Sequence, residues 1–296
     1  VKCNDDDNGQ HNRSRIDTVL DPGTYYVFVD SFNQRGGAFR LNVTLQDVPQ
    51  LADVCRGARP LPAGSVQNGT THGAFDLAQG TCSGGTPGPD VPYKLDLGQK
   101  MRARITMESN DFVPNVYVRR TCTDDRSQIG CFDQSSGMQQ NTQAVFVGLL
   151  DPGSYTVFAD SSQDNVDGQF TLEADLASEG GIGGAGDGCG DAMPLATSTT
   201  ASADTFDMKD DIAGTCSAPG APDVVYRIDV PHRSRVRASF DAEEGKSDHQ
   251  KGHVLVLQKT CGDRGTEMAC ANSVDQILAP GTYYLAVDGA TPSSFG

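Results

Sequence analysis

The chain of 296 residues contains no tryptophan, only five histidines and no long run of apolar residues. No window approaches the roughly 18 uninterrupted apolar residues that a membrane-spanning helix needs. Cations are also scarce, since 23 Lys and Arg residues stand against 39 Asp and Glu residues and give a formal net charge of −16. This balance argues against a nucleic-acid partner, which requires clustered cations, and against insertion into or docking on an anionic membrane.

The sequence also lacks the motifs of common catalytic sites. It contains no Gly-x-Ser-x-Gly, His-Glu-x-x-His or phosphate-binding loop. His249 and His253 are four residues apart, but they lie in an insertion rich in Gly, Lys and Asp, which favours a solvated loop over a weak metal site. We therefore expect a protein that is not an enzyme. The first residues carry no apolar core of a signal peptide, so we expect any export signal to lie upstream.

Glycine and proline, at 34 and 15 residues, punctuate a sequence that repeats itself. The segment Leu20–Asp30, which contains Pro-Gly-Thr-Tyr-Tyr, returns with few changes as Leu150–Asp160 and again as Leu278–Asp288. The period of about 130 residues is too long for a solenoid unit and fits a whole domain copied in tandem.

The repeats divide the chain into four parts. Residues 1–48 correspond to the C-terminal part of one copy, 49–177 to a complete copy, and 189–296 to a copy without its last strand. Residues 178–188 are rich in glycine and predict a flexible linker. Two explanations of the incomplete copies remain open: the chain is a piece of a longer array, or a neighbouring molecule supplies the missing strands.

Within a copy the apolar residues recur with a period of two, which indicates strands rather than helices. The run Phe39–Leu45 alternates apolar and polar side chains, as a strand with one solvated face does. A Pro-Gly turn precedes each repeated Tyr, and we expect the phenol to bond back across it, as in the tyrosine corner of Greek-key sandwiches. The sequence predicts an all-β fold of tandem jelly-roll-like or Greek-key β-sandwich domains with disulfides.

The order of these strands carries a resemblance to a known family. A Tyr-bearing strand at Asp90–Leu97 is followed by strands near Arg102–Met107 and Asp111–Arg119, then by the Pro-Gly-x-Tyr strand and a closing Gly-x-Phe-x-Leu strand at Gly168–Leu172. This pattern resembles the bacterial pre-peptidase C-terminal domains. The resemblance implies small jelly-roll-like sandwiches appended to secreted peptidases and other exported proteins, some of which bind calcium. The array also resembles the surface repeat proteins of exporting bacteria such as myxobacteria.

Eight of the nine cysteines recur at matching places in the second and third copies. Two pairs are 27 residues apart and two pairs are nine apart, which does not fit the Cys-x-x-Cys pairs of zinc knuckles. Disulfides explain them better and imply an oxidising compartment. Pairing of nearest neighbours in sequence predicts the bonds Cys55–Cys82, Cys122–Cys131, Cys189–Cys216 and Cys261–Cys270.

The ninth cysteine, Cys3, aligns with Cys131 and Cys270. Its partner would precede residue 1, so we expect it to be unpaired in this chain. A disulfide to another subunit is the alternative.

Carboxylates are frequent in two turns. The run Asn4–Gly9 and the loop 160–168 concentrate the hard oxygen ligands that calcium prefers, with a solvated turn as the alternative in each case. Asp90 and Asp223, which recur before the Tyr-bearing strand, are interpreted instead as caps that accept bonds from backbone amides. The candidate calcium ligands are Asp5, Asp7, Asp160, Asp164 and Asp167.

Two arginines at alternate positions also recur. Arg102 and Arg104 match Arg235 and Arg237, and alternate residues of a strand share one face. In an acidic protein we expect them to bind Asp or Glu of the same or the next domain, while an anionic glycan is the alternative partner.

The sequence thus favours a non-catalytic structural repeat protein at the cell surface or outside the cell. It would form a fibre, stalk or adhesin shaft that associates with itself or with neighbouring repeats, with strand complementation as one route to polymers. Two alternatives remain open: a calcium-dependent module that binds a glycan or matrix protein, and an accessory array of a secreted hydrolase. No cofactor other than calcium is expected.

Overall fold

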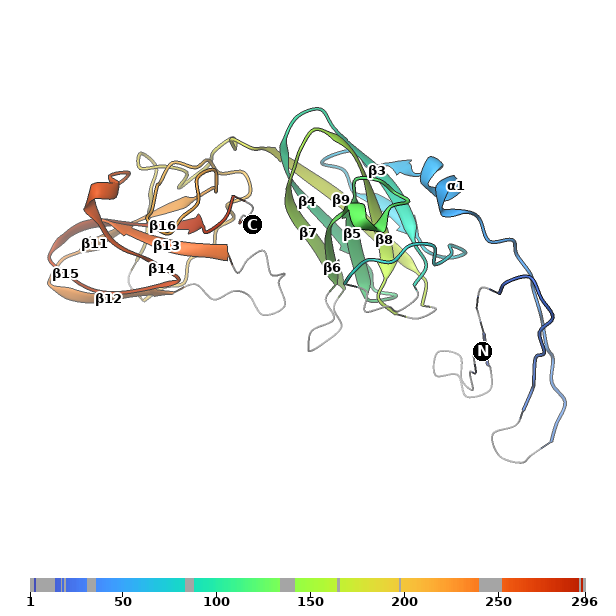
Figure 1. Ribbon diagram of the computed structural model, residues 1–296. Coiled ribbons are helices and arrows are strands. Elements are labelled where there is room, and N and C mark those ends of the chain that lie inside the picture. The colour runs from blue at the N-terminus through green and yellow to red at the C-terminus, as the bar shows by residue number, and fades with distance from the viewer. Residues whose placement is uncertain are drawn as a thin grey trace. The chain divides into compact units, whose positions relative to one another are not determined.

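The computed structural model describes residues 3, 14–16, 18, 20–30, 36–82, 88–133, 142–163, 166–196, 198–239, 252–292 and 294. The chain divides into two compact units, Val1–Gln50 and Leu51–Gly296. In the first unit the described residues form no helix or strand. The second unit starts with the short helix α1 (Leu51–Arg56), and its other described elements are strands and the single-turn 3-10 helices Asp125–Ser127 and Arg264–Thr266 (Figure 1).

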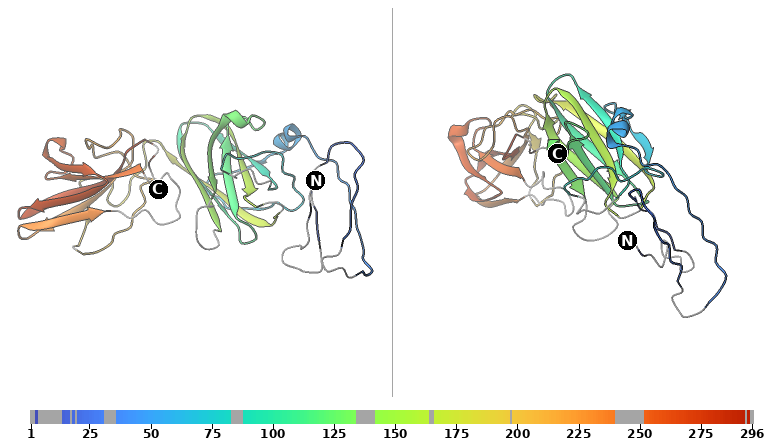
Figure 2. Two further views of the ribbon diagram at one scale, coloured as in Figure 1. Left: turned by 60° about the horizontal axis from the view of Figure 1, so that its bottom comes forward. Right: turned by 45° about the vertical axis from the view of Figure 1, so that its right-hand side comes forward.

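Strands β1 to β9 form the first β-sandwich. Its five-stranded sheet has the order β1 (Arg59–Pro60), β3 (Val91–Leu97), β8 (Gly153–Ser161), β5 (Pro114–Arg119) and β6 (Gln128–Asp133). Its four-stranded sheet has the order β2 (Gln67–Thr70), β9 (Gln169–Ser178), β4 (Met101–Glu108) and β7 (Gln143–Leu150). Figure 2 shows these strands, from blue and cyan through green to yellow-green, as two facing layers.

Strands β10 to β16 form the second sandwich. Its five-stranded sheet has the order β10 (Met193–Pro194), β11 (Val224–Val230), β16 (Gly281–Gly289), β13 (His253–Gln258) and β14 (Glu267–Ala271). This order matches that of the first sandwich strand for strand. The opposite sheet differs, because among the described residues it contains two strands, β12 (Ser234–Ser239) and β15 (Ser273–Leu278).

Each core lies between the two sheets of its sandwich, because alternate side chains of every strand point inward. The first core is fully closed, and its largest group of buried side chains includes Tyr93, Leu95, Ile105, Val157 and Leu172. The second core is assembled from the corresponding strands and includes Tyr226, Ile228, Leu257, Val274 and Leu285. The inward side chains Val236 and Ala238 of β12 are only half-buried, whereas the corresponding Ala103 and Ile105 of β4 are buried.

The predicted glycine with positive φ before the repeated Tyr is confirmed in the second and third copies. Gly153 and Gly281, which follow the prolines, have φ values of 147° and 152°, a region that glycine reaches without steric cost. The hydroxyls of Tyr25, Tyr155 and Tyr283 donate to the backbone oxygen four residues upstream, at distances of 2.9, 2.7 and 3.0 Å. All three copies of the motif therefore close the same hydrogen-bonded corner.

The predicted disulfide pairing is wrong. All eight repeated cysteines are bonded, but not to their nearest neighbours in sequence. The disulfides are Cys55–Cys122, Cys82–Cys131, Cys189–Cys261 and Cys216–Cys270, in place of the expected Cys55–Cys82, Cys122–Cys131, Cys189–Cys216 and Cys261–Cys270.

The β5–β6 hairpin explains the error. Cys131 on β6 lies opposite Tyr117 of β5, whereas Cys122 follows the end of β5 at Arg119. The two cysteines are therefore held several residues apart along the hairpin, although a disulfide needs Cα atoms within about 7 Å. Cys131 instead bonds to Cys82, which lies in the loop that covers the outer face of the five-stranded sheet. The disulfides thus fasten covering segments to a sheet.

The segment predicted as a flexible linker, residues 178–188, is hydrogen-bonded to the second sandwich. The backbone N–H groups of Ile182 and Gly183 donate to the backbone oxygen of Asp207 at 2.9 and 3.0 Å. Gly181 has a φ of 68°, and a Cβ atom there would lie 2.2 Å from the backbone oxygen of Met208. Gly183 and Gly186 also have a positive φ, so these three glycines are explained by backbone conformation rather than by flexibility.

Candidate functional site

A pair of aspartates is buried in the first sandwich. Asp90 precedes β3, and its Oδ2 accepts hydrogen bonds from the backbone N–H groups of Leu77 and Ala78, both at 2.8 Å. Its Oδ1 accepts from the hydroxyl of Tyr117 at 2.9 Å. Asp160 lies near the end of β8 and is also buried. Because Leu77 and Ala78 belong to the loop that covers the sheet, Asp90 ties this loop to the fold.

Burial changes the acidity of both side chains. Desolvation raises the pKa of Asp90 to about 7, against the lowering effect of its two backbone hydrogen bonds. Desolvation also raises the pKa of Asp160 well above its usual range, and the neighbouring Asp90 charge adds to this increase. Asp160 accepts hydrogen bonds from the backbone N–H of Ser161 at 2.6 Å and from Nδ2 of Asn115 at 3.2 Å.

The second sandwich contains the corresponding pair, Asp223 and Asp288, at zero exposure. Oδ2 of Asp223 accepts from the backbone N–H groups of Asp211 and Ile212, both at 2.8 Å, while its Oδ1 has no hydrogen-bond partner in the described part of the chain. Desolvation raises the pKa of Asp223 to about 8 and that of Asp288 to about 7. Both sandwiches thus bury two carboxyl groups whose pKa values burial raises above their usual range.

The arginines of β4 make the contact between the two sandwiches. Arg102 is almost fully buried, and its Nη1 donates to the backbone oxygens of Phe206 at 3.1 Å and Met208 at 2.6 Å. Nη2 of Arg104 donates to Oδ1 of Asp204 at 2.8 Å, and its guanidinium lies 4.4 Å from the ring centroid of Phe206. Two neighbouring residues of one strand face therefore hold one loop of the second sandwich.

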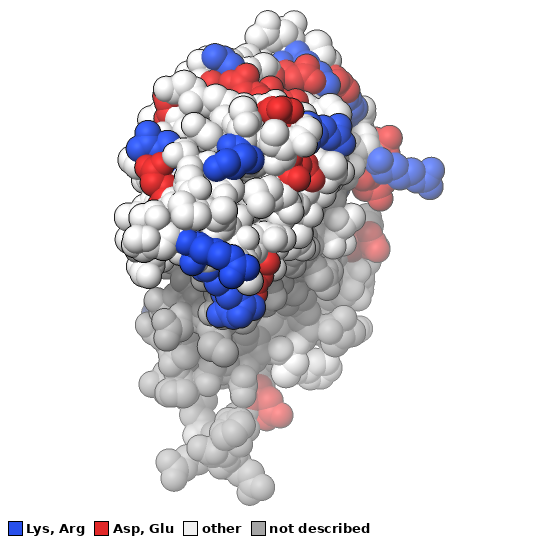
Figure 3. All heavy atoms as spheres, turned by 90° about the vertical axis from the view of Figure 1, so that its left-hand side faces the viewer, with Lys and Arg blue, Asp and Glu red and all other residues white. Residues whose placement is uncertain are grey.

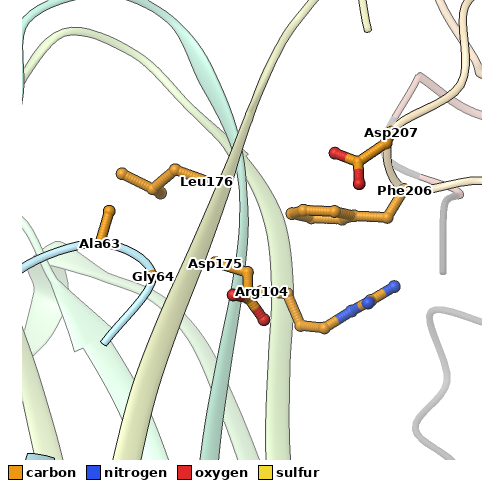
Figure 4. Close-up of a pocket in the computed structure, with 7 residues that line it drawn as sticks. All are labelled: Ala63, Gly64, Arg104, Asp175, Leu176, Phe206 and Asp207. Atoms are coloured by element: carbon orange, nitrogen blue, oxygen red, sulfur yellow. The ribbon is translucent and has the colours of Figure 1, made fainter. Parts of the chain in front are cut away.

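The Phe206 ring completes this contact. It is buried in a cluster with Val147 and Ala177, which belong to β7 and β9 of the first sandwich. Beside it lies a cavity of about 380 Å³ whose lining includes Arg104, Asp175, Phe206 and Asp207 (Figure 4). The contact combines the buried Phe206 ring with charge-assisted hydrogen bonds, which are roughly twice as strong as hydrogen bonds between neutral groups.

The matching arginines of β12 bind an acid within their own sandwich. Nε and Nη2 of Arg235 donate to the two carboxylate oxygens of Asp275 at 2.7 and 2.6 Å, and Nε of Arg237 donates to Oδ2 at 3.3 Å. These bonds hold the pKa of Asp275 below its usual range. Three of the four arginines therefore bind an acid of the same or of the next sandwich, as predicted, whereas Arg102 donates to backbone oxygens. On the face drawn in Figure 3, basic and acidic side chains are interspersed rather than gathered in one patch.

One edge of β12 carries no strand in the described part of the second sandwich. In the first sandwich β4 lies between β7 and β9, but β12 pairs with β15 alone. The chain also contains an extended segment, Gly36–Val48, that repeats the apolar spacing of β9 and forms no strand. Its apolar side chains are open to solvent, with exposures of 69% for Phe39, 51% for Leu41, 65% for Val43 and 92% for Leu45.

The predicted calcium ligands are spread over different environments. Asp5, Asp7 and Asp164 lie outside the described residues. Asp160 is buried in the aspartate pair described above, and Oδ1 of Asp167 lies 3.1 Å from Nδ1 of His72. In the described ranges, no group of three or more His, Cys, Asp or Glu side chains is arranged to hold a metal ion.

The structure also shows the surroundings of two further residues that the sequence singled out. Cys3 is a free, exposed cysteine. His253, expected in a solvated loop, is instead the buried first residue of β13. Searching the helices that the structure describes finds none long and apolar enough to cross a membrane. Four disulfides are typical of a domain that folds outside the cytosol.

Sequence reasoning missed two of these features. Asp90 and Asp223 were expected to accept bonds from backbone amides, and they do, but from a loop more than ten residues upstream rather than from their own turn. Their partners Asp160 and Asp288 end the repeated Tyr strand, and that recurrence was the available signal for a buried pair. Phe206 gave no signal, because a single aromatic residue in a loop does not reveal its partner.

Comparisons with known proteins give no family assignment. No protein-family model matches the chain, and no curated protein matches it. Among solved structures, the pre-peptidase C-terminal domain of a collagenase from Bacillus anthracis is 13% identical, with a TM-score of 0.29; the match covers 44% of this chain and 99% of that one. A putative secreted protein from Eubacterium rectale is 7% identical over 85% of this chain and 80% of that one, with a TM-score of 0.22. At such TM-scores the assignment of a β-sandwich rests on the sheets of this chain itself.

Proposed function

We propose that this chain is a non-catalytic structural protein of the cell surface, in which tandem β-sandwiches form a fibre, stalk or adhesin shaft. The contact of Arg102, Arg104 and Phe206 between successive sandwiches is the observation that carries the proposal. A shaft needs joints that resist bending, and this joint combines a buried aromatic ring with hydrogen bonds from two guanidinium groups. The hydrogen-bonded glycine segment at 178–188 supports the same role.

Three further observations agree with a tandem array. The five-stranded sheets of the two sandwiches have the same strand order, and their disulfides join corresponding positions. The tyrosine corner occurs three times, which suits a copied domain. Disulfides that fasten the covering segments suit a protein that persists outside the cell.

The contact between the two sandwiches can be tested by substituting its two arginines. Replacing Arg102→Gln and Arg104→Gln removes charged hydrogen bonds to a loop of the second sandwich, each of which contributes roughly 1.5–3 kcal/mol. We expect thermolysin to cleave before Ile182 at least about tenfold faster, because cleavage follows the population of the open joint. The initial rate, with the cut located by mass spectrometry, is the measurement.

The chain supplies its own matched control. Arg235→Gln and Arg237→Gln change the same residue types at the corresponding strand positions, where the arginines contact Asp275 of their own sandwich. This variant should leave cleavage at Ile182 unchanged. Rapid cleavage of the unmodified chain, equal to that of the Arg102/Arg104 variant, would show that the joint is not held and would contradict a stiff shaft.

A further inference from the structure

We propose that residues 209–215 of the second sandwich form a flap that opens when Asp223 and Asp288 ionise and closes when they regain their protons. The flap lies over the outer face of the five-stranded sheet, where its Ile212 packs with Val225 in a buried apolar cluster. Opening would expose this cluster, so the surface of the protein would change with pH. This inference is independent of the structural role proposed above.

The two aspartates face each other across adjacent strands. β11 and β16 pair antiparallel with Val224 opposite Val287, so continuing the register by one residue places Asp223 opposite Asp288. Oδ1 of Asp223 and Oδ2 of Asp288 are buried and have no hydrogen-bond partner in the part of the chain that the structure describes. Like charges at directly opposite positions destabilise a strand pair, so ionisation of both acids favours a rearrangement that admits water.

Asp223 holds the middle of the flap. Its Oδ2 accepts from the backbone N–H groups of Asp211 and Ile212, both at 2.8 Å. Its own backbone N–H donates to the backbone oxygen of Lys209 at 3.0 Å. The carboxyl group that fastens the flap is therefore one of the two that ionise.

Both ends of the flap are anchored. Before it, the backbone oxygen of Met208 accepts from Nη1 of Arg102 at 2.6 Å. After it, Cys216 is bonded to Cys270. Opening can therefore be confined to the residues between these anchors and requires no loss of the strands.

The charged groups around the pair do not compensate its ionisation. Asp210 of the flap adds a negative charge that raises the pKa of both acids. Nζ of Lys209 lies 3.5 Å from Oδ2 of Asp187. Further titratable neighbours are Glu267 of β14, which accepts from the backbone N–H of the last flap residue at 2.8 Å, and His253, which begins β13. The cation of the flap is thus directed to another acid.

The first sandwich supplies a hydrogen bond that the second one lacks. There the residue of β5 opposite Asp160 is Asn115, whose Nδ2 donates to Oδ2 of Asp160 at 3.2 Å. In the second sandwich the residue of β13 opposite Asp288 is Val254, whose side chain has no donor. An amide at position 254 would therefore supply a partner for the buried Oδ2 of Asp288.

The direction of the pH dependence follows from proton binding. In the closed state burial raises the pKa of Asp288 to about 7 and that of Asp223 to about 8, whereas water in the open state returns both toward 3.8. The closed state therefore binds more protons than the open state. The open population should rise as the pH increases from about 4 to 8, by about tenfold per pH unit for each proton released.

Amide hydrogen exchange of the full-length chain at pH 6 and pH 8, read by mass spectrometry, tests the flap. Each rate is divided by that of the urea-unfolded chain at the same pH. The corrected rate at Asp211 and Ile212 should rise at least about tenfold between the two pH values. At pH 8 it should exceed that of Leu255 and Leu257 in β13, which report opening of the whole sandwich. A corrected flap rate that is independent of pH, or equal to that of β13, would overturn the inference.

A substitution at position 254 tests whether the pair controls the flap. Val254→Asn should lower the corrected exchange rate of Ile212 at pH 8 about tenfold, because the amide donates to a charged oxygen. Val254→Ile is the matched control, since it adds no donor and should leave that rate unchanged. Equal rates in the two variants would show that the pair does not control the flap. The cleavage rate at Ile182 tests the shaft separately.

Discussion

Replacing Cys82→Ser and Cys131→Ser should lower the free energy of unfolding of the first sandwich by about 4 kcal/mol. The disulfide closes a loop with a sequence separation of 49 residues, and in the chain-entropy model such a loop restricts the unfolded chain by about that amount. The bond also holds the covering loop on Tyr117 and Phe158, so its loss should expose that apolar cluster.

Urea unfolding followed by tyrosine fluorescence measures this effect. The second sandwich keeps its own disulfide, Cys216–Cys270, so its transition should stay in place while that of the first sandwich moves to lower urea. Cys3→Ser is the control, because Cys3 is exposed and unbonded and its loss should change nothing. A midpoint unchanged by the double substitution would contradict the pairing found here.

The second large effect is a loss of stability as the pH rises. Asp223 and Asp288 have folded-state pKa values of about 8 and about 7, against 3.8 in the unfolded chain. The folded state therefore binds more protons than the unfolded state between pH 4 and 8, so the free energy of unfolding falls as pH increases through this range. Since one pKa unit corresponds to about 1.4 kcal/mol, the loss is about 6 kcal/mol for Asp223 and about 4 kcal/mol for Asp288.

Asp288→Asn should flatten this dependence in the second sandwich. The amide cannot ionise, and it can donate to an oxygen of Asp223, so the pair no longer carries two charges at high pH. Asp275→Asn is the matched control, because this exposed carboxylate is already ionised above pH 5 and should leave the slope unchanged. Thermal unfolding at pH 5, 7 and 9 measures both. A free energy of unfolding that rises with pH in the unmodified chain would contradict the raised pKa values of Asp223 and Asp288.

The fold could be predicted from local patterns, because strands, Pro-Gly turns and tyrosine corners are set by residues close in sequence. The phenol of Tyr155 reaches Asp151, four residues upstream, and the sequence alone indicated that bond. The disulfides could not be paired in this way. Cys122 and Cys131 are near in sequence, but the β5–β6 hairpin directs them toward different covering segments.

The partners of the β4 and β12 arginines could be predicted even less well from the sequence. The recurrence of Arg102 and Arg104 in a later copy predicted a role for both, and the acidic composition predicted an acidic partner. Which partner each pair binds could not be predicted from the sequence. Arg104 lies opposite Val147 of β7 and Asp175 of β9 but bonds to Asp204 of the next sandwich, whereas Asp275 lies opposite Arg237 and binds both arginines of β12. That difference appears only once the strand register is known.

The crossed disulfides also determine how the chain would respond to tension. The loops closed by Cys55–Cys122 and Cys82–Cys131 overlap. A force applied to the two ends of the first sandwich therefore cannot extend residues 55–131 to their full contour length. Only the later strands, including β7 to β9, could unravel and lengthen. A surface filament made of such units would yield by a short, limited extension and recoil without losing the covalently closed half of each sandwich.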